Sequence, residues 1–274
     1  MLDGMDVLII SYAAPAIAKA WSISPANLGV VFSSGLVGMT VGAIFLAPFA
    51  DRIGRKSTML IAGLLMATCI YATSYATDVN LLMIFRFISG LGIGAMMATT
   101  AALTAENSPV STRNFWVSTV VAGYPVGAVL SGLIAATVIK TSGWEHLFEL
   151  AGFATFLSLP LVGLFIKESF AASQSAEEKP SVQILVKEPY RISTFQLWTA
   201  LFLAFATLYF MLNWIPKLAT NAGLSMSAAI YAGTVFNLGA IVGIPMQGYC
   251  SSRFGLKKTI GTILLFTAVT MLSF

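Results

Sequence analysis

The seven residues Ala50-Asp51-Arg52-Ile53-Gly54-Arg55-Lys56 place four charges between two long apolar runs. The pattern returns 201 positions later, where Ser252-Arg253-Phe254-Gly255-Leu256-Lys257 aligns with the stretch from Asp51 to Lys56. Arginine, glycine and lysine recur at matched positions. A short charged turn between apolar segments, present twice, indicates that the chain is built from a duplicated membrane unit.

The composition is that of a protein that resides in a lipid bilayer. Of the 274 residues, 57% are hydrophobic and only 9% are charged, and the mean hydropathy is +0.86, whereas a soluble domain carries about 25% charge. The 15 basic residues are spread singly, so no continuous basic face for nucleic acid is expected. Two cysteines and one histidine, His146, are too few for a Cys/His metal centre. We therefore expect an integral membrane protein without a metal, a cofactor or a nucleic-acid partner.

Nine segments reach or approach the length of about 20 apolar residues that a spanning helix needs. They are 5–21, 28–50, 58–76, 79–102, 115–139, 147–166, 195–216, 227–249 and 259–274. The long polar stretch 167–194 predicts a linker between an N-terminal six-helix bundle, 1–166, and a partial C-terminal bundle, 195–274. The repeat offset predicts six helices per unit, so we expect a fragment of a twelve-helix protein that stops after helix 9.

The distribution of basic residues predicts how the chain is oriented. Eleven of the fifteen lysines and arginines lie in the links after the second, fourth, sixth and eighth segments, and such links stay in the cytoplasm. We therefore expect the N-terminus and the linker on the cytoplasmic side of a bacterial inner membrane. All five tryptophans fall near predicted segment ends, where their rings suit the membrane interface.

The first charged turn resembles the loop signature of the major facilitator superfamily, Gly-x-x-x-Asp-Arg-x-Gly-Arg-Lys, with Ala47 at its first position. The second copy departs from it at Ser252 and Leu256. The resemblance implies an all-α membrane fold of the major facilitator type. The alternative is that the charged turn only fixes the orientation of the helices in the membrane. It also implies a gating hairpin and a charge network, for which the residues are Asp51, Arg52, Gly54, Arg55, Lys56, Glu106, Arg113, Arg253 and Gly255.

Two further expectations concern this network. Glu106 lies at the end of its segment where the helix dipole disfavours an anion, and an ion pair with Arg113 or with Arg55 would offset that mismatch. By resemblance, Asp51 faces an eleventh helix that the chain lacks, so the 274 residues alone are expected to show no proton-dependent uptake. The second turn should lie against the inner end of segment 115–139, near Arg113.

Arg86 is the one basic residue inside an apolar segment. At 1.5 Å per residue it lies on the order of 10 Å into the membrane, where an arginine needs water or a carboxylate. A structural arginine that snorkels outward is the alternative. Followed by Gly90 and Gly94, it resembles the superfamily's Arg-x-x-x-Gly element of helix 4, which is associated with proton coupling.

Asp3 and Asp6 share one helix face at the expected inner end of the first helix. Capping of the helix N-terminus would explain them. A carboxylate that is desolvated or lies beside another charge can instead load and release a proton near neutral pH. Asp-Gly-x-Asp followed by Ala-Ala-Pro-Ala-Ile at 13–17 resembles the aromatic acid:proton symporter group, in which both carboxylates are implicated in transport.

Three further residues, Tyr124, Tyr209 and Asn213, are possible substrate contacts, because aromatic rings and an amide can recognise a ring-bearing carboxylate. Helix packing is the alternative for each. Together these features predict a monomeric proton-coupled symporter, not an enzyme, whose partners are the bilayer, a proton and a small organic anion such as a hydroxybenzoate. The alternatives are a non-transporting fragment, a transporter of another organic acid or metabolite, and an ATP-driven permease subunit or membrane enzyme.

Overall fold

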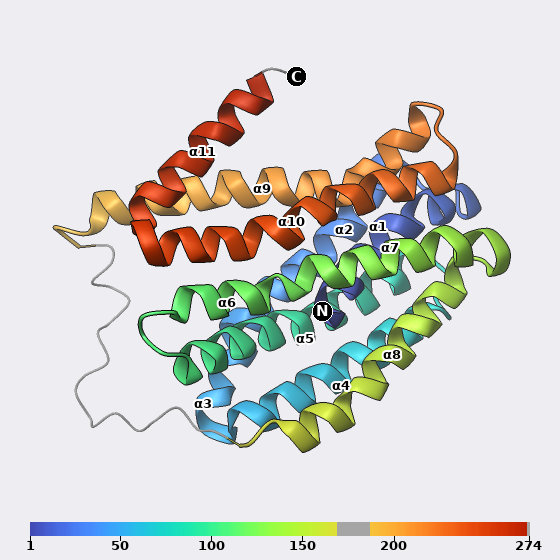
Figure 1. Cartoon of the computed structure of the whole chain (residues 1–274). Coiled ribbons are helices and arrows are strands. Elements are labelled where there is room, and N and C mark those ends of the chain that lie inside the picture. The colour runs from blue at the N-terminus through green and yellow to red at the C-terminus, as the bar shows by residue number, and fades with distance from the viewer. Residues whose placement is uncertain (169–186, 273–274) are drawn as a thin grey trace.

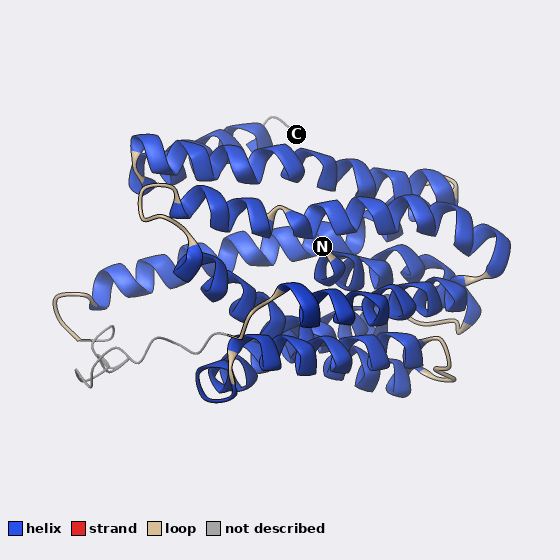
Figure 2. Ribbon diagram, turned by 60° about the horizontal axis from the view of Figure 1, so that its bottom comes forward, coloured by secondary structure: helices blue, strands red, loops and turns tan. Residues whose placement is uncertain are grey.

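In the computed structural model, residues 1–168 and 187–272 are described, and the regular elements in these ranges are all helices (Figure 2). In chain order they are α1 (Leu2–Ala20), α2 (Pro25–Val41), the π-helical turn η1 (Gly42–Leu46), the 3-10 turn η2 (Ala47–Phe49), α3 (Ala50–Ile53), α4 (Arg55–Thr73), α5 (Val79–Asn107), α6 (Arg113–Val121), α7 (Gly123–Ser142), α8 (Trp144–Phe165), α9 (Arg191–Asn221), α10 (Met226–Phe254) and α11 (Leu256–Leu272).

Seven helical stretches of the described residues are long and apolar enough to cross a membrane. Two of these spans consist of more than one helical element: α2 continues through η1 and η2 to Ile53, and α6 continues into α7 after a break at Ala122. The break at Ala122 lies where Pro125 has no N–H to offer the carbonyl of Val121. Nine spans were predicted, and the two that are not among these seven are α1 and α11. Helix α1 contains three charged residues, and α11 has only 17 described residues.

The two charged turns have the same backbone conformation, which confirms the duplication. Gly54 has φ 97° and Gly255 has φ 88°, values that favour glycine because it has no Cβ. Each glycine N–H donates to a carbonyl four residues earlier, and each glycine carbonyl accepts from the hydroxyl of a threonine four residues later, Thr58 at 2.9 Å and Thr259 at 3.1 Å. The same offset relates the serine caps of α2 and α10, Ser24 and Ser225.

Helix α1 starts halfway along the bundle. We call the end of the bundle that carries the two charged turns the hairpin end; it lies at the left in Figure 1, where the N-terminus is near the centre. Met1 packs against Gly123 and Gly127, ten residues or more into the span that begins at Arg113. The expectation that the chain starts at the inner face, with Asp3 and Asp6 there, is therefore wrong: both lie deep in the bundle.

Glycines let helices α2 and α5 approach to backbone contact. A Cβ on Gly38 would meet the carbonyl oxygen of Phe87, and one on Gly94 would meet that of Met39. A Cβ on Gly42 would likewise meet the carbonyl oxygen of Leu91, and one on Gly90 would meet that of Gly35. This small-residue stripe is the usual way for membrane helices to pack closely, and it fixes how α5 presents Arg86 to the rest of the bundle.

Helices α9 and α10 pack on the N-terminal bundle, α9 against α1 and α10 against α6 and α7 (Figure 1). The hydroxyl of Ser11 on α1 donates to the side-chain oxygen of Asn213 on α9 at 2.9 Å. At the hairpin end, a Cβ on Gly248 would lie 3.0 Å or less from atoms of Asn114 and Ser118 on α6. This contact places the end of α10, one turn before the second charged turn, beside the start of α6. Most of the predicted linker, residues 169–186, lies outside the described residues.

The packing of α2 on α5 predicts the effect of one added methyl group. Gly94→Ala should destabilise the protein by about 1–3 kcal/mol, because the new Cβ overlaps the backbone of α2 and the two helices must separate. Denaturation in detergent, followed by circular dichroism, measures this. Gly239→Ala on α10 is the control, because nothing lies within 4 Å of its Cβ position; equal effects for the two variants would contradict the packing argument.

Candidate functional site

A buried arginine of α5 lies against a buried aspartate of α1. Arg86 is 4% exposed and its Nη1 donates to the backbone carbonyl of Asp6 at 3.0 Å. Asp6 is 0% exposed. The guanidinium also lies against α2, where the absence of a side chain at Gly35 leaves it room: a Cβ there would be 3.6 Å from Nη2. The sequence predicts that Arg86 needs water or a carboxylate, and in the structure Asp6 of α1 lies against it.

The carboxylate of Asp6 has no hydrogen-bond donor among the described residues. Thr155 of α8 lies beside it, but the Thr155 hydroxyl donates to the carbonyl of Ala151 at 2.9 Å. A buried carboxylate without a donor carries a large desolvation penalty. The negative charge of the Asp6 carboxylate can be neutralised in two ways, by the nearby positive charge of Arg86 or by binding a proton. Asp6 is therefore suited to exchange one for the other.

Asp3 has different surroundings from Asp6. Its Oδ1 lies 3.0 Å from the N-terminal amine of Met1, and its side chain is 19% exposed. It lines a cavity of about 310 Å³ among α1, α4, α5, α7 and α8, together with Tyr124 and Thr155. The hydroxyl of Tyr124 is buried without a hydrogen-bond partner among the described residues. The two aspartates share a helix, yet only Asp6 is packed against Arg86.

Asn213 and Tyr209 lie on the face of α9 that meets α1 and α2. The amide of Asn213 is held at both ends, since its oxygen accepts from Ser11 and its nitrogen donates to the carbonyl of Tyr209 at 2.8 Å. Asn213 and Arg86 line the same small void between α1, α2, α5 and α9. Tyr209 and Asn213 also line a groove between α2 and α9. Two of the three possible substrate contacts are thus adjacent, whereas Tyr124 lines the cavity inside the N-terminal bundle.

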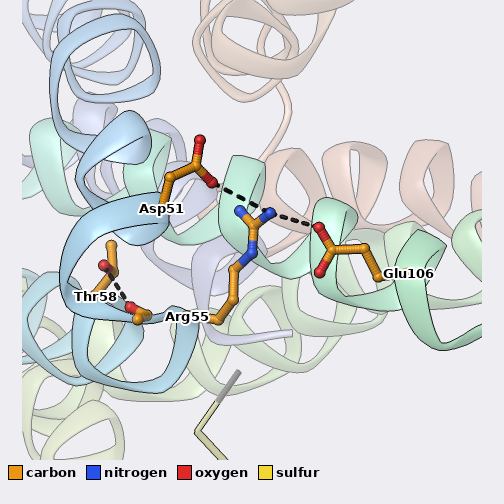
Figure 3. A network of polar contacts seen from close by, with 5 residues as sticks. Asp51, Arg55, Thr58 and Glu106 are labelled. Atoms are coloured by element: carbon orange, nitrogen blue, oxygen red, sulfur yellow. Dashed lines mark hydrogen bonds and ion pairs between the residues drawn. The ribbon is translucent and has the colours of Figure 1, made fainter. Parts of the chain in front are cut away.

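At the hairpin end, the first charged turn forms an ion-pair network (Figure 3). The guanidinium of Arg55 lies 2.5 Å from Glu106 of α5 and 3.4 Å from Asp51. The Arg55 side chain is 10% exposed, while those of Glu106 and Asp51 are 40% and 41% exposed. Of the two partners that the sequence left open for Glu106, the structure has Arg55. Arg113 opens α6 as an exposed residue.

The sequence reasoning missed Glu168, which follows α8 and caps α4. Its carboxylate accepts from the backbone N–H of Lys56 at 3.0 Å, from that of Ser57 at 3.3 Å, and from the Ser57 hydroxyl at 2.7 Å. A helix N-terminus needs such acceptors and favours an anion. The glycine at position 54 offers α4 no side-chain cap of its own, and that uncapped start was the signal that could have indicated a partner from elsewhere in the chain.

The remaining hairpin residues make local contacts or face outward. Arg253 donates to the hydroxyl of Tyr249 at 3.3 Å and lies over the ring of Phe254. Arg52 is exposed. No group of three His, Cys, Asp or Glu side chains that could hold a metal ion occurs in residues 1–168 and 187–272.

A family model described as Major Facilitator Superfamily matches residues 1–274, the whole chain. The chain belongs to the Major Facilitator Superfamily. The duplicated hairpin, its network with Glu106 and the helical bundles are therefore features of a transport protein of this superfamily.

Curated relatives of this superfamily member carry the names of aromatic acid transporters. A 4-hydroxybenzoate transporter PcaK of Pseudomonas aeruginosa is 30% identical over 98% of this chain and 67% of its own length. A gallate transporter of Pseudomonas putida is 28% identical over 95% of this chain and 65% of its own. A gentisate transporter of Corynebacterium glutamicum is 27% identical, over 93% and 60%. The chain thus spans about two thirds of the length of these relatives.

Solved structures show the same fold at lower identity. A bacterial homologue of the human lysosomal transporter Spinster, in an inward-facing and occupied conformation, superposes with a TM-score of 0.70 at 18% identity, covering 92% of this chain and 59% of the other. A D-xylose-proton symporter gives a TM-score of 0.68 at 18% identity, with coverages of 92% and 66%. The major facilitator fold expected from the two charged turns is confirmed.

The geometry of the Arg55 network predicts unequal effects of its two carboxylates. Glu106→Gln should lower the free energy of unfolding by about 1–2 kcal/mol, because it removes the close partner of a largely buried guanidinium. Asp51→Asn should cost less than about 0.5 kcal/mol, since its contact is longer and its side chain half-exposed. Denaturation of the purified variants tests this, and a larger loss for Asp51→Asn would contradict it.

The cap on α4 predicts a second difference at the hairpin end. Glu168→Ala should cost about 1 kcal/mol, the usual value for a lost N-cap, and should increase hydrogen exchange at the amides of Lys56 and Ser57. Lys167→Ala, one residue earlier, is the matched control. Unchanged exchange at these two amides in Glu168→Ala would show that the cap does not hold the start of α4.

Proposed function

We propose that this protein is a proton-coupled transporter that brings a small aromatic carboxylate, such as a hydroxybenzoate, into the cell. The observation that carries the proposal is the Asp6 carboxylate, buried without a hydrogen-bond donor beside the buried Arg86. A role in membrane transport is supported by membership of the superfamily. The proton, the class of substrate and the direction are inferences from the site and the relatives.

The mechanism uses the fact that the charge of Arg86 is effectively permanent. When Asp6 is ionised, its negative charge balances Arg86, and an anionic substrate gains little by approaching. When Asp6 takes up a proton, the positive charge of Arg86 is available to a substrate carboxylate. Substrate and proton then bind together, which is the requirement for symport, and movement of the two bundles exposes both to the opposite side.

Several observations support an aromatic carboxylate as the substrate. The relatives are named for 4-hydroxybenzoate, gallate and gentisate, all of them hydroxylated benzoates. In this chain, Asn213 lines the same void as Arg86, and Tyr209 lies one turn before Asn213 on α9. The site thus combines a cation, an amide and an aromatic ring. We propose that the network of Arg55 and Glu106 forms a gate at the hairpin end of the N-terminal bundle.

A second candidate is a protein that binds the substrate but does not transport it alone. In the most apolar window of α9, only 6% of residues are buried within the described structure, and the relatives are longer than this chain. Uptake of labelled 4-hydroxybenzoate into proteoliposomes containing the 274-residue chain separates the two candidates. Accumulation that a protonophore abolishes supports transport by this chain, and binding without accumulation supports the second candidate.

The role of Asp6 is tested by counting protons during binding. Calorimetry in nanodiscs, with buffers of different ionisation enthalpy, measures how many protons accompany binding of 4-hydroxybenzoate. In the wild-type protein we expect proton uptake at pH values where Asp6 is ionised, because binding and protonation favour each other. In Asp6→Asn, which is neutral at every pH, this uptake should fall to near zero while binding persists.

Two further variants complete that test. Arg86→Gln should weaken binding at least about tenfold, because the substrate carboxylate loses its counter-charge. Asp78→Asn, at the exposed N-cap of α5, should leave both the affinity and the proton count unchanged. Proton uptake that persists in Asp6→Asn would contradict the proposed role of this residue.

A further inference from the structure

An aromatic groove runs between α2 and α9. Its volume is about 440 Å³, which lies within the usual range of 300–1,000 Å³ for sites that bind small molecules. Four rings contribute to its wall, Phe32 from α2 and Tyr209, Phe210 and Trp214 from α9. Small residues on α2, Ala26 and Gly29, keep the groove open, and the Cβ position of Gly29 is 3.7 Å from the Trp214 ring.

The rings are arranged for contact with another ring. Phe32 and Trp214 meet edge to face, with centroids 5.6 Å apart and planes at 81°. Phe210 is stacked on Trp214 at 6.3 Å. Aromatic pairs in edge-to-face and offset stacked geometry are favourable beyond the area that they bury, so a third ring between α2 and α9 can use both modes.

The groove leads to the buried arginine. Phe32, Leu36 and Asn213 line the groove and also line the void that contains Arg86. At Asn213 the groove borders this void, so the inner end of a planar molecule in the groove is on the side of Arg86. The wall of the groove also includes the hydroxyl-bearing side chains of Ser33 and Tyr209, with which a hydroxylated ring acid can form hydrogen bonds but a lipid tail cannot.

We infer that this groove is the ring subsite of the transporter. The ring of an aromatic carboxylate packs against Phe32 and Trp214, which are already in contact with each other. Its carboxylate points toward Arg86, and a ring hydroxyl lies at the polar wall. This inference rests on the proposed function and deepens it, because it assigns the preference for aromatic acids to α2 and α9. Trp214 and Phe32 determine specificity for the ring, whereas Arg86 recognises the carboxylate.

The test compares an aromatic acid with an aliphatic acid on the 274-residue protein in nanodiscs. Trp214→Ala and Phe32→Ala should each weaken binding of 4-hydroxybenzoate about tenfold or more, and should change binding of hexanoate by less than about threefold. Trp214→Phe keeps a ring and should recover most of the affinity. Trp198→Ala is the matched control, because Trp198 is on the same helix but lines neither the groove nor the void.

A direct readout guards against variants that do not fold. Quenching of tryptophan fluorescence by 4-hydroxybenzoate should be largely lost in Trp214→Phe and kept in Trp198→Phe. If the wild-type protein binds the acid but the groove variants keep its affinity and the quenching persists in Trp214→Phe, the ring subsite is refuted and the proposed function stands. If the wild-type protein does not bind aromatic acids at all, both are refuted.

Discussion

The burial of one permanent charge in a membrane bundle is the constraint on which this structure depends. Arg86 cannot lose its proton at ordinary pH and is almost completely removed from solvent. An isolated charge in hydrocarbon costs several kcal/mol, so the surrounding helices must compensate it. Arg86 donates to one backbone carbonyl of α1. The carboxylate of Asp6 lies near it, buried and without a hydrogen-bond partner among the described residues, and we propose that this carboxylate is the group that takes up a proton.

Close helix packing places this pair. The glycine stripe between α2 and α5 sets the rotation of α5, and Gly35 leaves room for the guanidinium. On the other side, a Cβ on Gly4 would overlap the backbone of Tyr124, so α1 and α7 also meet at backbone distance. These contacts fix the depth of Asp6 relative to Arg86. In this bundle the glycines therefore serve the electrostatics of the site as well as its packing.

Much of the architecture could be predicted from the sequence, because hydrophobic length and repeated turns carry that information directly. The duplicated pattern indicated two turns of the same kind, and Gly54 and Gly255 do share a positive φ and a threonine contact. The need of Arg86 for water or a carboxylate followed from its expected depth in the membrane. The depth of Asp3 and Asp6 was predicted wrongly, because the sequence does not show at which level of α7 the start of α1 packs. The close approach of Met1 to Gly127 sets that level.

Other features depend on contacts between distant segments. Glu168 caps α4 from 111 and 112 residues away, and nothing in its own neighbourhood in the sequence indicates this role. Trp214 was expected near a helix end, at the membrane interface. Helix α9 instead continues through Pro216 to Asn221, so this ring contacts Phe32 of α2 and forms part of a groove. Only the pairing of the two helices reveals it.

The central claim is that the Asp6 carboxyl exchanges its proton in response to the substrate. Isotope-edited infrared spectroscopy of aspartate-labelled protein in nanodiscs measures this directly, with Asp6→Asn to assign the band. We expect a carboxyl stretch that is absent in Asp6→Asn, that titrates with pH, and whose titration midpoint changes when 4-hydroxybenzoate is added. An Asp6 band that responds to neither pH nor substrate would contradict it.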